Sequence, residues 1–262
     1  MRKLSEPQTY HIAFFSILVG LASITTNAQS APISISYDHV YQDVKKLQSV
    51  LKDFNLLTVE VKFYSGLCGA DPNDINLYIQ TKSGKELPVP LDRYGFAKIP
   101  LSKNIYGSRA LIVSNQASDF KYQIKIGIIL PTNSNITYTR LTDIMQQATS
   151  AIKRSSSLPS FLMPNVAGLI LIYNKPGSSV VVKIPDKNLI FSSQPANGFI
   201  GLPENSWIIK FYQDKALKNL NPIVELQNLP DKIEPLFDPD IEAAVNKKIN
   251  ENNLNCKQNS AQ

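Results

Sequence analysis

The sequence has 262 residues, of which 43% are hydrophobic and 18% are charged, and its formal net charge is +6. This composition is typical of an ordered globular protein and excludes a largely disordered chain. The basic residues lie in short scattered pairs, such as Lys45-Lys46 and Lys153-Arg154, without interleaved aromatic residues. The pattern therefore does not favour nucleic-acid binding.

The N-terminal segment has the pattern of a cleavable signal peptide. Arg2 and Lys3 precede an apolar run of about 13 residues, Ile12–Ile24, which is too short to span a bilayer. Small residues follow, and cleavage between Ala28 and Gln29 fits them; the alternative is an uncut N-terminal anchor. We expect the remaining 262 − 28 = 234 residues to be periplasmic or secreted, with at most peripheral membrane contact.

An internal repeat at a shift of 101 residues organises the rest of the chain. One copy starts at Ile35 as ISYDHVYQDVKKLQSVL, and the other starts at Ile136 as ITYTRLTDIMQQATSAI. Apolar residues recur in both at the spacing of one helical face, and Ser36 and Thr137 stand where a hydroxyl caps a helix. The pattern predicts two equivalent helices, in which Tyr37 pairs with Tyr138, Val40 with Leu141, Val44 with Met145 and Leu51 with Ile152.

A second match supports the repeat. Gly95–Pro100 corresponds to Gly198–Pro203 at a shift of 103 residues, with Gly-Phe, an aliphatic residue and Pro at fixed offsets. Two matches in the same order at nearly equal shifts indicate a tandem duplication. The alternative is a single domain in which similar α+β segments recur.

Short segments rich in β-branched and aromatic residues, separated by turn clusters, predict the strands. Such short, closely spaced strands favour antiparallel pairing, because a parallel crossover needs a dozen or more residues. The expected fold class is α+β, with two tandem modules that each pack one helix on a small, mostly antiparallel β-sheet or sandwich. The expected strands are Thr58–Tyr64, Ile75–Thr81, Phe96–Ile99, Arg109–Ser114 and Lys121–Leu130 in the first module, then Gly168–Tyr173, Ser179–Ile184, Leu189–Phe191, Phe199–Leu202, Trp207–Tyr212 and Ile223–Gln227 in the second.

A third helix is expected at the C-terminus. Asp238 can cap it, and Pro239 suits its first position. Apolar residues then recur every four positions, at Ile241, Val245 and Ile249. The expected organisation is a signal peptide (1–28), a first module (29–131), a second module (132–236) and a C-terminal helix with a polar tail (237–262).

The repeated order of a YxxxY helix, an apolar strand and a Gly-x-x-x-Ile/Leu-Pro strand resembles an uncharacterised family of periplasmic domains of unknown function from gamma-proteobacteria. In the first module the motif residues are Tyr37, Tyr41, Gly95, Ile99 and Pro100, whereas in the second Thr142 replaces the second tyrosine. The resemblance implies a periplasmic location and no known activity. The modules also resemble transthyretin-type accessory sandwiches, which bears on fold alone.

The mature chain has two cysteines, Cys68 and Cys256. In an oxidising compartment a disulfide between them is the simplest expectation, and it would tie the C-terminal tail to the first module. The alternatives are two free thiols, or a nucleophilic Cys68, which would need a nearby base or cation.

The residues give no sign of catalytic, metal-binding or cofactor-binding chemistry. His39 is the one histidine outside the signal peptide, and no G-x-S-x-G, P-loop or HExxH motif is present. The acidic stretch Asp71–Asp74 is expected to form an Asx turn, and the acidic residues Asp231, Glu234, Asp238 and Asp240 are expected to cap and flank the C-terminal helix. Trp207 is expected in the core.

These observations favour an exported, non-catalytic envelope protein that binds a protein partner or an envelope component. Two alternatives stay open. One is a hydrolase of glycans or peptidoglycan that uses carboxylates brought together by folding. The other is a small-molecule carrier with a cleft between the modules. No cofactor is expected in any of these cases.

Overall fold

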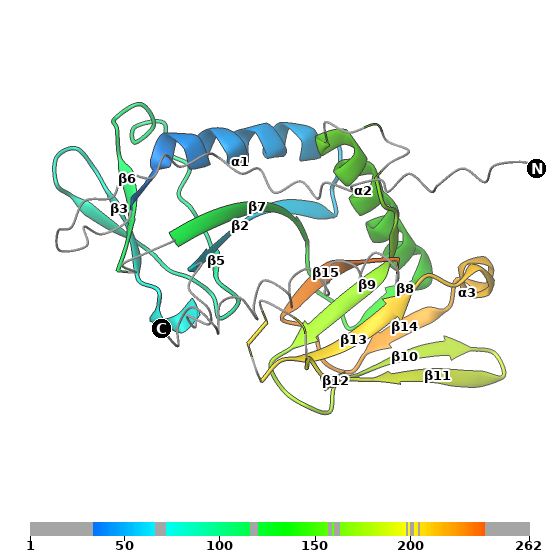
Figure 1. Ribbon diagram of the computed structural model, residues 1–262. Coiled ribbons are helices and arrows are strands. Elements are labelled where there is room, and N and C mark those ends of the chain that lie inside the picture. The colour runs from blue at the N-terminus through cyan, green and yellow to red at the C-terminus, as the bar shows by residue number, and fades with distance from the viewer. Residues whose placement is uncertain are drawn as a thin grey trace, which may run out of the picture.

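The computed structural model describes residues 34–65, 72–115, 120–156, 159, 163–197, 199, 202–203 and 205–238. It confirms the α+β class, with helices packed on small antiparallel sheets (Figure 1). The first module contains β1 (Ser34–Ser36), α1 (Tyr37–Leu51), β2 (Leu57–Ser65), the short 3-10 helix η1 (Pro72–Asp74), β3 (Leu77–Gln80), β4 (Glu86–Val89), β5 (Phe96–Ala97), β6 (Leu111–Ser114) and β7 (Phe120–Ile128).

The second module repeats this plan with two additions, β12 and α3. It contains β8 (Asn135–Thr137), α2 (Tyr138–Ser155), β9 (Val166–Tyr173), β10 (Ser179–Ile184), β11 (Lys187–Ser192), β12 (Gln194–Pro195), β13 (Trp207–Tyr212), α3 (Lys215–Leu220), β14 (Ile223–Leu226) and β15 (Lys232–Phe237).

The strand orders of the two modules are equivalent. The order β1-β6-β3-β4 in the first module matches β8-β14-β10-β11 in the second, and β5-β2-β7 matches β13-β9-β15, to whose free edge β12 is added. All strand pairs are antiparallel. The two modules therefore share one topology in the same chain order, and their origin by duplication stays a prediction.

Each long helix begins with a buried tyrosine that fixes it to the sheets in the same way. The amide of Tyr37 donates to the carbonyl before β6, Ala110 O, at 3.1 Å, and the amide of Tyr138 donates to the carbonyl before β14, Pro222 O, at 3.0 Å. The predicted helix caps differ: Thr137 accepts from Arg140 N at 3.3 Å, whereas Ser36 makes no side-chain cap.

The second sequence match does not mark equivalent strands. Phe96 lies in β5, whose counterpart by pairing is β13, and both Phe199 and Leu202 lie outside strands. The strand expected at Phe199–Leu202 is therefore wrong for these two residues, which pack as side chains against the cluster around Phe96. The strands β1, β4, β8, β12 and β15 and the helix α3 were not expected, and the predicted C-terminal helix lies outside the described residues.

The hydrophobic cores of the modules are not separate. The first core gathers the apolar stripe of α1 over β2 and β3, with Tyr37, Val40 and Phe63 at its centre. The second core packs α2 over β9, and the turn after α1 enters it through Leu51, Phe54 and Leu56. Figure 1 shows α1 over the β2–β7 pair and α2 beside it, at the junction of the two modules.

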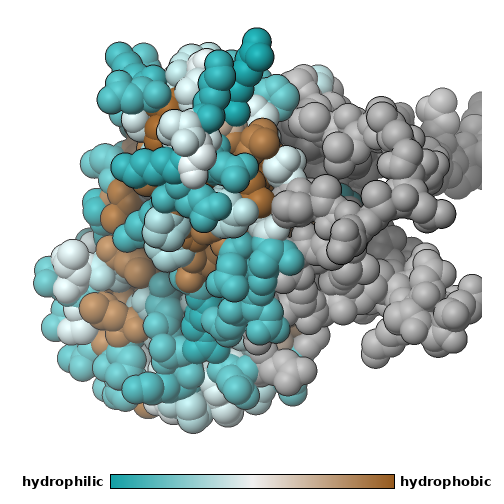
Figure 2. Space-filling view, turned by 90° about the vertical axis from the view of Figure 1, so that its left-hand side faces the viewer, coloured by the Kyte–Doolittle hydropathy of each residue, from teal (hydrophilic) through white to brown (hydrophobic). Residues whose placement is uncertain are grey.

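Direct contacts join the modules on both sides of this shared core. Gln147 of α2 accepts from Leu56 N and donates to Asn55 Oδ1, each at 3.0 Å. On the other side Tyr94 and Phe96 pack against Ile170, Ile172 and Ile208 in a third apolar cluster. On the face in Figure 2, hydrophobic residues form separate patches among hydrophilic ones, as on an ordinary solvated surface.

Candidate functional site

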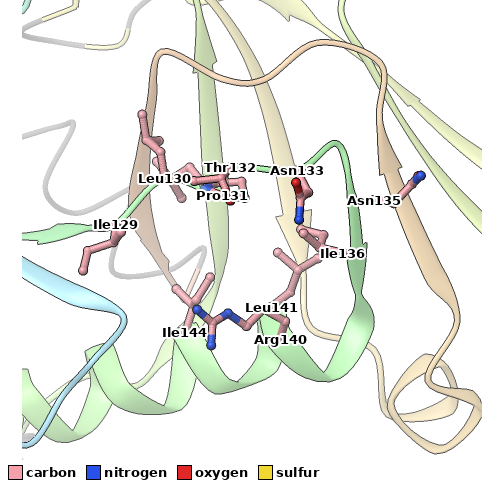
Figure 3. Close-up of a pocket in the computed structure, with 11 residues that line it drawn as sticks. Ile129, Leu130, Pro131, Thr132, Asn133, Asn135, Ile136, Arg140, Leu141 and Ile144 are labelled. Atoms are coloured by element: carbon pink, nitrogen blue, oxygen red, sulfur yellow. The ribbon is translucent and has the colours of Figure 1, made fainter.

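A pocket of about 280 Å³ lies between the linker that joins the modules and the first turns of α2. Figure 3 shows Leu130, Pro131 and Thr132 on the linker and Arg140, Leu141 and Ile144 on the helix. Leu141 and Ile144 are buried because they belong to the apolar stripe of α2, and Ile233 of β15 also lines the pocket. The linker contributes exposed apolar side chains, with Ile129 48% and Leu130 39% exposed.

The lining of this pocket combines one cation with neutral polar and apolar residues. Arg140 is the one charged residue of its lining, and the neutral polar residues are Thr132, Asn133 and Asn135. The remaining lining residues are apolar: Ile129, Leu130, Pro131, Ile136, Leu141, Ile144 and Ile233. A guanidinium stays protonated in proteins and presents a planar fork of donors, so the pocket can hold an anionic group beside an apolar one.

The position of Arg140 in the first turn of α2 favours the binding of an anion. It is the third residue of α2, where the free amides of the helix already carry partial positive charge. A cation in the first turn costs on the order of 0.3–1 kcal/mol, and a bound anion would reverse that cost. Within the described residues the Arg140 guanidinium forms no ion pair with a carboxylate. At a shift of 101 residues its counterpart on α1 is His39.

A second pocket, also about 280 Å³, is polar and lies at one end of β9. Asp231 closes the turn there by accepting from Asn174 N at 2.6 Å and from Asn174 Nδ2 at 3.1 Å. The Tyr173 hydroxyl at this pocket is buried and has no hydrogen-bond partner within the described residues. Burial, with a smaller contribution from Asp231, raises the pKa of Tyr173. Without a hydrogen-bond partner among the described residues, the buried hydroxyl carries an uncompensated desolvation cost.

The densest group of charges lies where the β5-β2-β7 sheet meets β15. Lys232 Nζ is 2.6 Å from Glu60 Oε2, and Lys125 Nζ is 3.1 Å from Glu234 Oε1. The ring of Phe96 lies among three ammonium groups, with Lys232 Nζ 3.3 Å, Lys62 Nζ 5.5 Å and Lys125 Nζ 5.6 Å from its centroid. We name these six residues the Phe96 cluster. Its ion pairs and cation–π contacts join the two modules.

The Phe96 cluster shifts two ionisation equilibria. Burial, together with the charge of Lys125, lowers the pKa of Lys62 to about 8. Burial alone would raise the pKa of Glu234, but the ammonium groups of Lys125, Lys232 and Lys62 outweigh it and hold that pKa below its usual value. Asp231 and Glu234 were predicted to flank a helix, whereas Asp231 closes the turn at Asn174 and Glu234 lies in β15, paired with Lys125.

The residues singled out in the sequence do not meet in one site. His39 is exposed on α1, Trp207 packs against the second core as predicted, and Asp74 lies in η1 rather than in a simple turn. The cysteines Cys68 and Cys256 and the cleavage residues Ala28 and Gln29 lie outside the described residues. Among the residues that the structure describes, no three His, Cys, Asp or Glu side chains are grouped to hold a metal ion.

Arg140 was not identified from the sequence. It lies in a helical repeat with no motif around it, and only folding brings the linker over it. A signal was nevertheless present, since a basic residue in the first turn of a predicted helix opposes the helix dipole.

Comparison with known proteins gives one match. A family model described as "Protein of unknown function (DUF2987)" matches residues 29–173, more than half of the chain. No curated protein and no solved structure matches. In the part of the chain that the structure describes, no helix has the length and apolar character to cross a membrane.

Proposed function

The chain belongs to the DUF2987 family of unknown function, and from this premise we propose that it is an exported, non-catalytic binding protein for a carboxylate-headed amphiphile of the cell envelope. The observation that carries the proposal is the single cation, Arg140, in a pocket that is otherwise apolar or neutral. Ligand sites of this kind fix orientation with a few polar groups and take most of their affinity from apolar burial.

The charge and size of the pocket narrow the ligand class. One guanidinium balances one negative charge and matches a carboxylate through two parallel hydrogen bonds, whereas a phosphate monoester carries nearly two charges. At about 30 Å³ for each water-sized heavy atom, 280 Å³ has room for roughly nine heavy atoms. This supports a carboxylate with a short acyl chain, or the carboxylate end of a longer one.

Several features support binding rather than catalysis. The two carboxylates of the Phe96 cluster are each paired with a lysine, and the pKa of Glu234 is lowered. A glycosidase acid needs the opposite shift, because it must hold a proton near neutral pH. Within the described residues the exposed His39 side chain makes no hydrogen bond or ion pair, and the pocket lining contains no carboxylate that could act as a base.

Binding can be tested with three probes of one chain length. Titration calorimetry on the mature chain should give a clear affinity for octanoate, a weaker one for octanol and the weakest for octylammonium. Arg140→Gln should remove the preference for octanoate over octanol, and Arg140→Lys should keep part of it. Lys46→Gln, which removes one charge from the exposed face of α1, is the control and should leave the preference intact.

Equal affinity of the wild type for octanoate and octanol, or no binding of octanoate, would overturn the proposed ligand class. Export has its own test, since the full chain produced in a bacterial host should appear in the envelope fraction with Gln29 as its first residue. A cytoplasmic protein that keeps residues 1–28 would contradict export without bearing on the pocket.

A further inference from the structure

The strand β11 is a free edge of the second module. It pairs with β10 on one side, and within the described residues no strand pairs with its other side. Figure 1 shows the β10–β11 hairpin at the outer limit of this module. At its centre Ile190 is 66% exposed, the most of any large hydrophobic side chain described. An uncovered edge of this kind is a template for pairing with another chain.

The hairpin geometry shows which backbone groups face outward. Ser193 N donates to Ser178 O at 2.9 Å, so residues 178 and 193 form a hydrogen-bonded pair of the ladder. Hydrogen-bonded and non-hydrogen-bonded pairs alternate along an antiparallel ladder. The register therefore directs the N–H and C=O groups of Asn188, Ile190 and Ser192 away from β10.

The equivalent edge of the first module is protected. Its edge strand is β4, and Pro88 lies opposite Tyr78 there, as Ile190 lies opposite Val181 in β11. Thr81 N donates to Lys85 O, which makes Pro88 an outward-facing position in the same alternation. A proline at that position offers no donor to an incoming strand, so it blocks pairing without weakening the β3–β4 ladder. The two modules thus differ at one matched position, Pro88 against Ile190.

We propose that β11 pairs antiparallel with β11 of a second copy of this chain, about a two-fold axis at Ile190. The two four-stranded sheets would then join into one continuous sheet across the dimer. The inference is independent of the ligand pocket, because β11 contributes no residue to that pocket.

The sequence of β11 is complementary to itself in this register. Ile190 meets Ile190 of the second copy on the outer face, and Asn188 meets Ser192. On the inner face Leu189 meets Phe191, both of which already pack partly against the core of their own module. The one charged residue of the strand, Lys187, would lie opposite Ser193, so the pairing places no like charges opposite each other.

A second copy explains these features better than an unrelated extended segment would. The order polar, apolar, polar at Asn188, Ile190 and Ser192 is symmetric about Ile190, and so is the apolar pair on the inner face. One six-residue strand buries little area, so the dimer should be weak and should form only at high protein concentration.

Sedimentation velocity of the full mature chain over a concentration series tests the pairing. The wild type should pass from monomer to dimer as concentration rises. Ile190→Pro places at this edge the residue that protects the first module. It should weaken dimerisation by about tenfold or more, because each copy loses one outward hydrogen bond. Ile190→Lys should weaken it by a similar factor, because it places two ammonium groups opposite each other at the axis.

Ile223→Lys is the matched control. Ile223 is 43% exposed in the same sheet but lies in β14, an interior strand, so its replacement should leave dimerisation unchanged. Circular dichroism of each variant confirms that the fold is retained. A wild type that stays monomeric at the highest concentrations, or a dimer that neither Ile190 variant weakens, would overturn the proposal.

Discussion

Tyr37 and Tyr138 make the same pair of hydrogen bonds at the start of their helices. The Tyr37 hydroxyl donates to Pro100 O at 2.6 Å and accepts from Ser102 N at 3.0 Å. The Tyr138 hydroxyl donates to Asp214 O at 3.2 Å and accepts from Asp214 N at 2.6 Å. Both side chains are fully buried. Each tyrosine therefore fixes its helix to the segment that leaves β5 or β13.

Removing either hydroxyl should destabilise the protein. Tyr37→Phe and Tyr138→Phe each remove two part-buried hydrogen bonds to the backbone, which should cost about 1–3 kcal/mol in total. Urea unfolding of each variant measures the loss. Tyr106→Phe is the control, because its hydroxyl lies in an exposed contact with Gln42 and should change the free energy of unfolding by less than about 0.5 kcal/mol. Equal effects at all three positions would contradict this role.

Tyr173→Phe should not lower the free energy of unfolding, in contrast to Tyr37→Phe and Tyr138→Phe. The Tyr173 hydroxyl is buried without a hydrogen-bond partner in the described residues, so its loss removes a desolvation cost of about 1–3 kcal/mol. The variant should be as stable as the wild type or more stable in the same urea assay. A clear destabilisation would indicate that the hydroxyl is satisfied by ordered water in the second pocket.

The helices and most strands were predictable because their patterns are local. The apolar stripe at Val40 and Val44 and its counterpart at Leu141 and Met145 reflect burial on one helical face, which the structure confirms. The strand β15 was missed because Lys232 and Glu234 break the apolar pattern. Both face the partner sheet and are neutralised by charges far along the chain, Glu60 and Lys125, and no local pattern reports such pairs.

The burial of Lys62 should make the stability of the protein depend on pH in the alkaline range. Its pKa is lowered from 10.5 to about 8, so between these values the unfolded chain holds a proton there that the folded chain has released. The contribution of Lys62 to the free energy of unfolding should therefore rise with pH across this window. The free energy of unfolding of the wild type minus that of Lys62→Met should rise from pH 8 to 10.5 in urea unfolding. Lys98→Met, at an exposed position, is the control. A difference that stays flat or falls with pH would count against the burial of this ammonium group.

Gly168 should not tolerate a side chain. A Cβ there would lie 2.9 Å from Tyr212 Cα and closer still to the carbonyl oxygen of Phe211, and neither backbone atom can move without disturbing β13. Gly168→Ala should cost about 1–3 kcal/mol or more in thermal or urea unfolding. At Gly127 an added Cβ meets the side chain of Glu60 instead, which can move more readily than backbone but at the expense of its ion pair with Lys232. Gly127→Ala should therefore cost less, and the reverse order would contradict the packing.

The pairing of Cys68 with Cys256 stays a prediction. In protein recovered from an oxidising compartment, intact mass before and after reduction should differ by two hydrogens, and peptide mapping should join the two cysteines. Closing so long a loop contributes on the order of 4–5 kcal/mol in the chain-entropy model, so Cys256→Ser should lower the free energy of unfolding. Free thiols in such protein would rule the bond out.

The candidate pocket was harder to predict than the fold. Its residues come from the linker, from β8, from α2 and from β15, which meet only in the folded chain. Ile129 and Leu130 were predicted as the end of a strand, whereas β7 ends at Ile128 and these two residues line the pocket from the linker. The lining residues of such a pocket follow no helix or strand period in the sequence. Its one charged residue, Arg140, belongs to no sequence motif.

The insertion of Phe54 and Leu56 into the core beneath α2 has a consequence for how the molecule melts. Two modules with independent cores would unfold in two separate transitions. Here the unfolding of the first module would remove Phe54 and Leu56 from the core of the second module and expose that core. We therefore expect both modules to unfold together in a single cooperative transition.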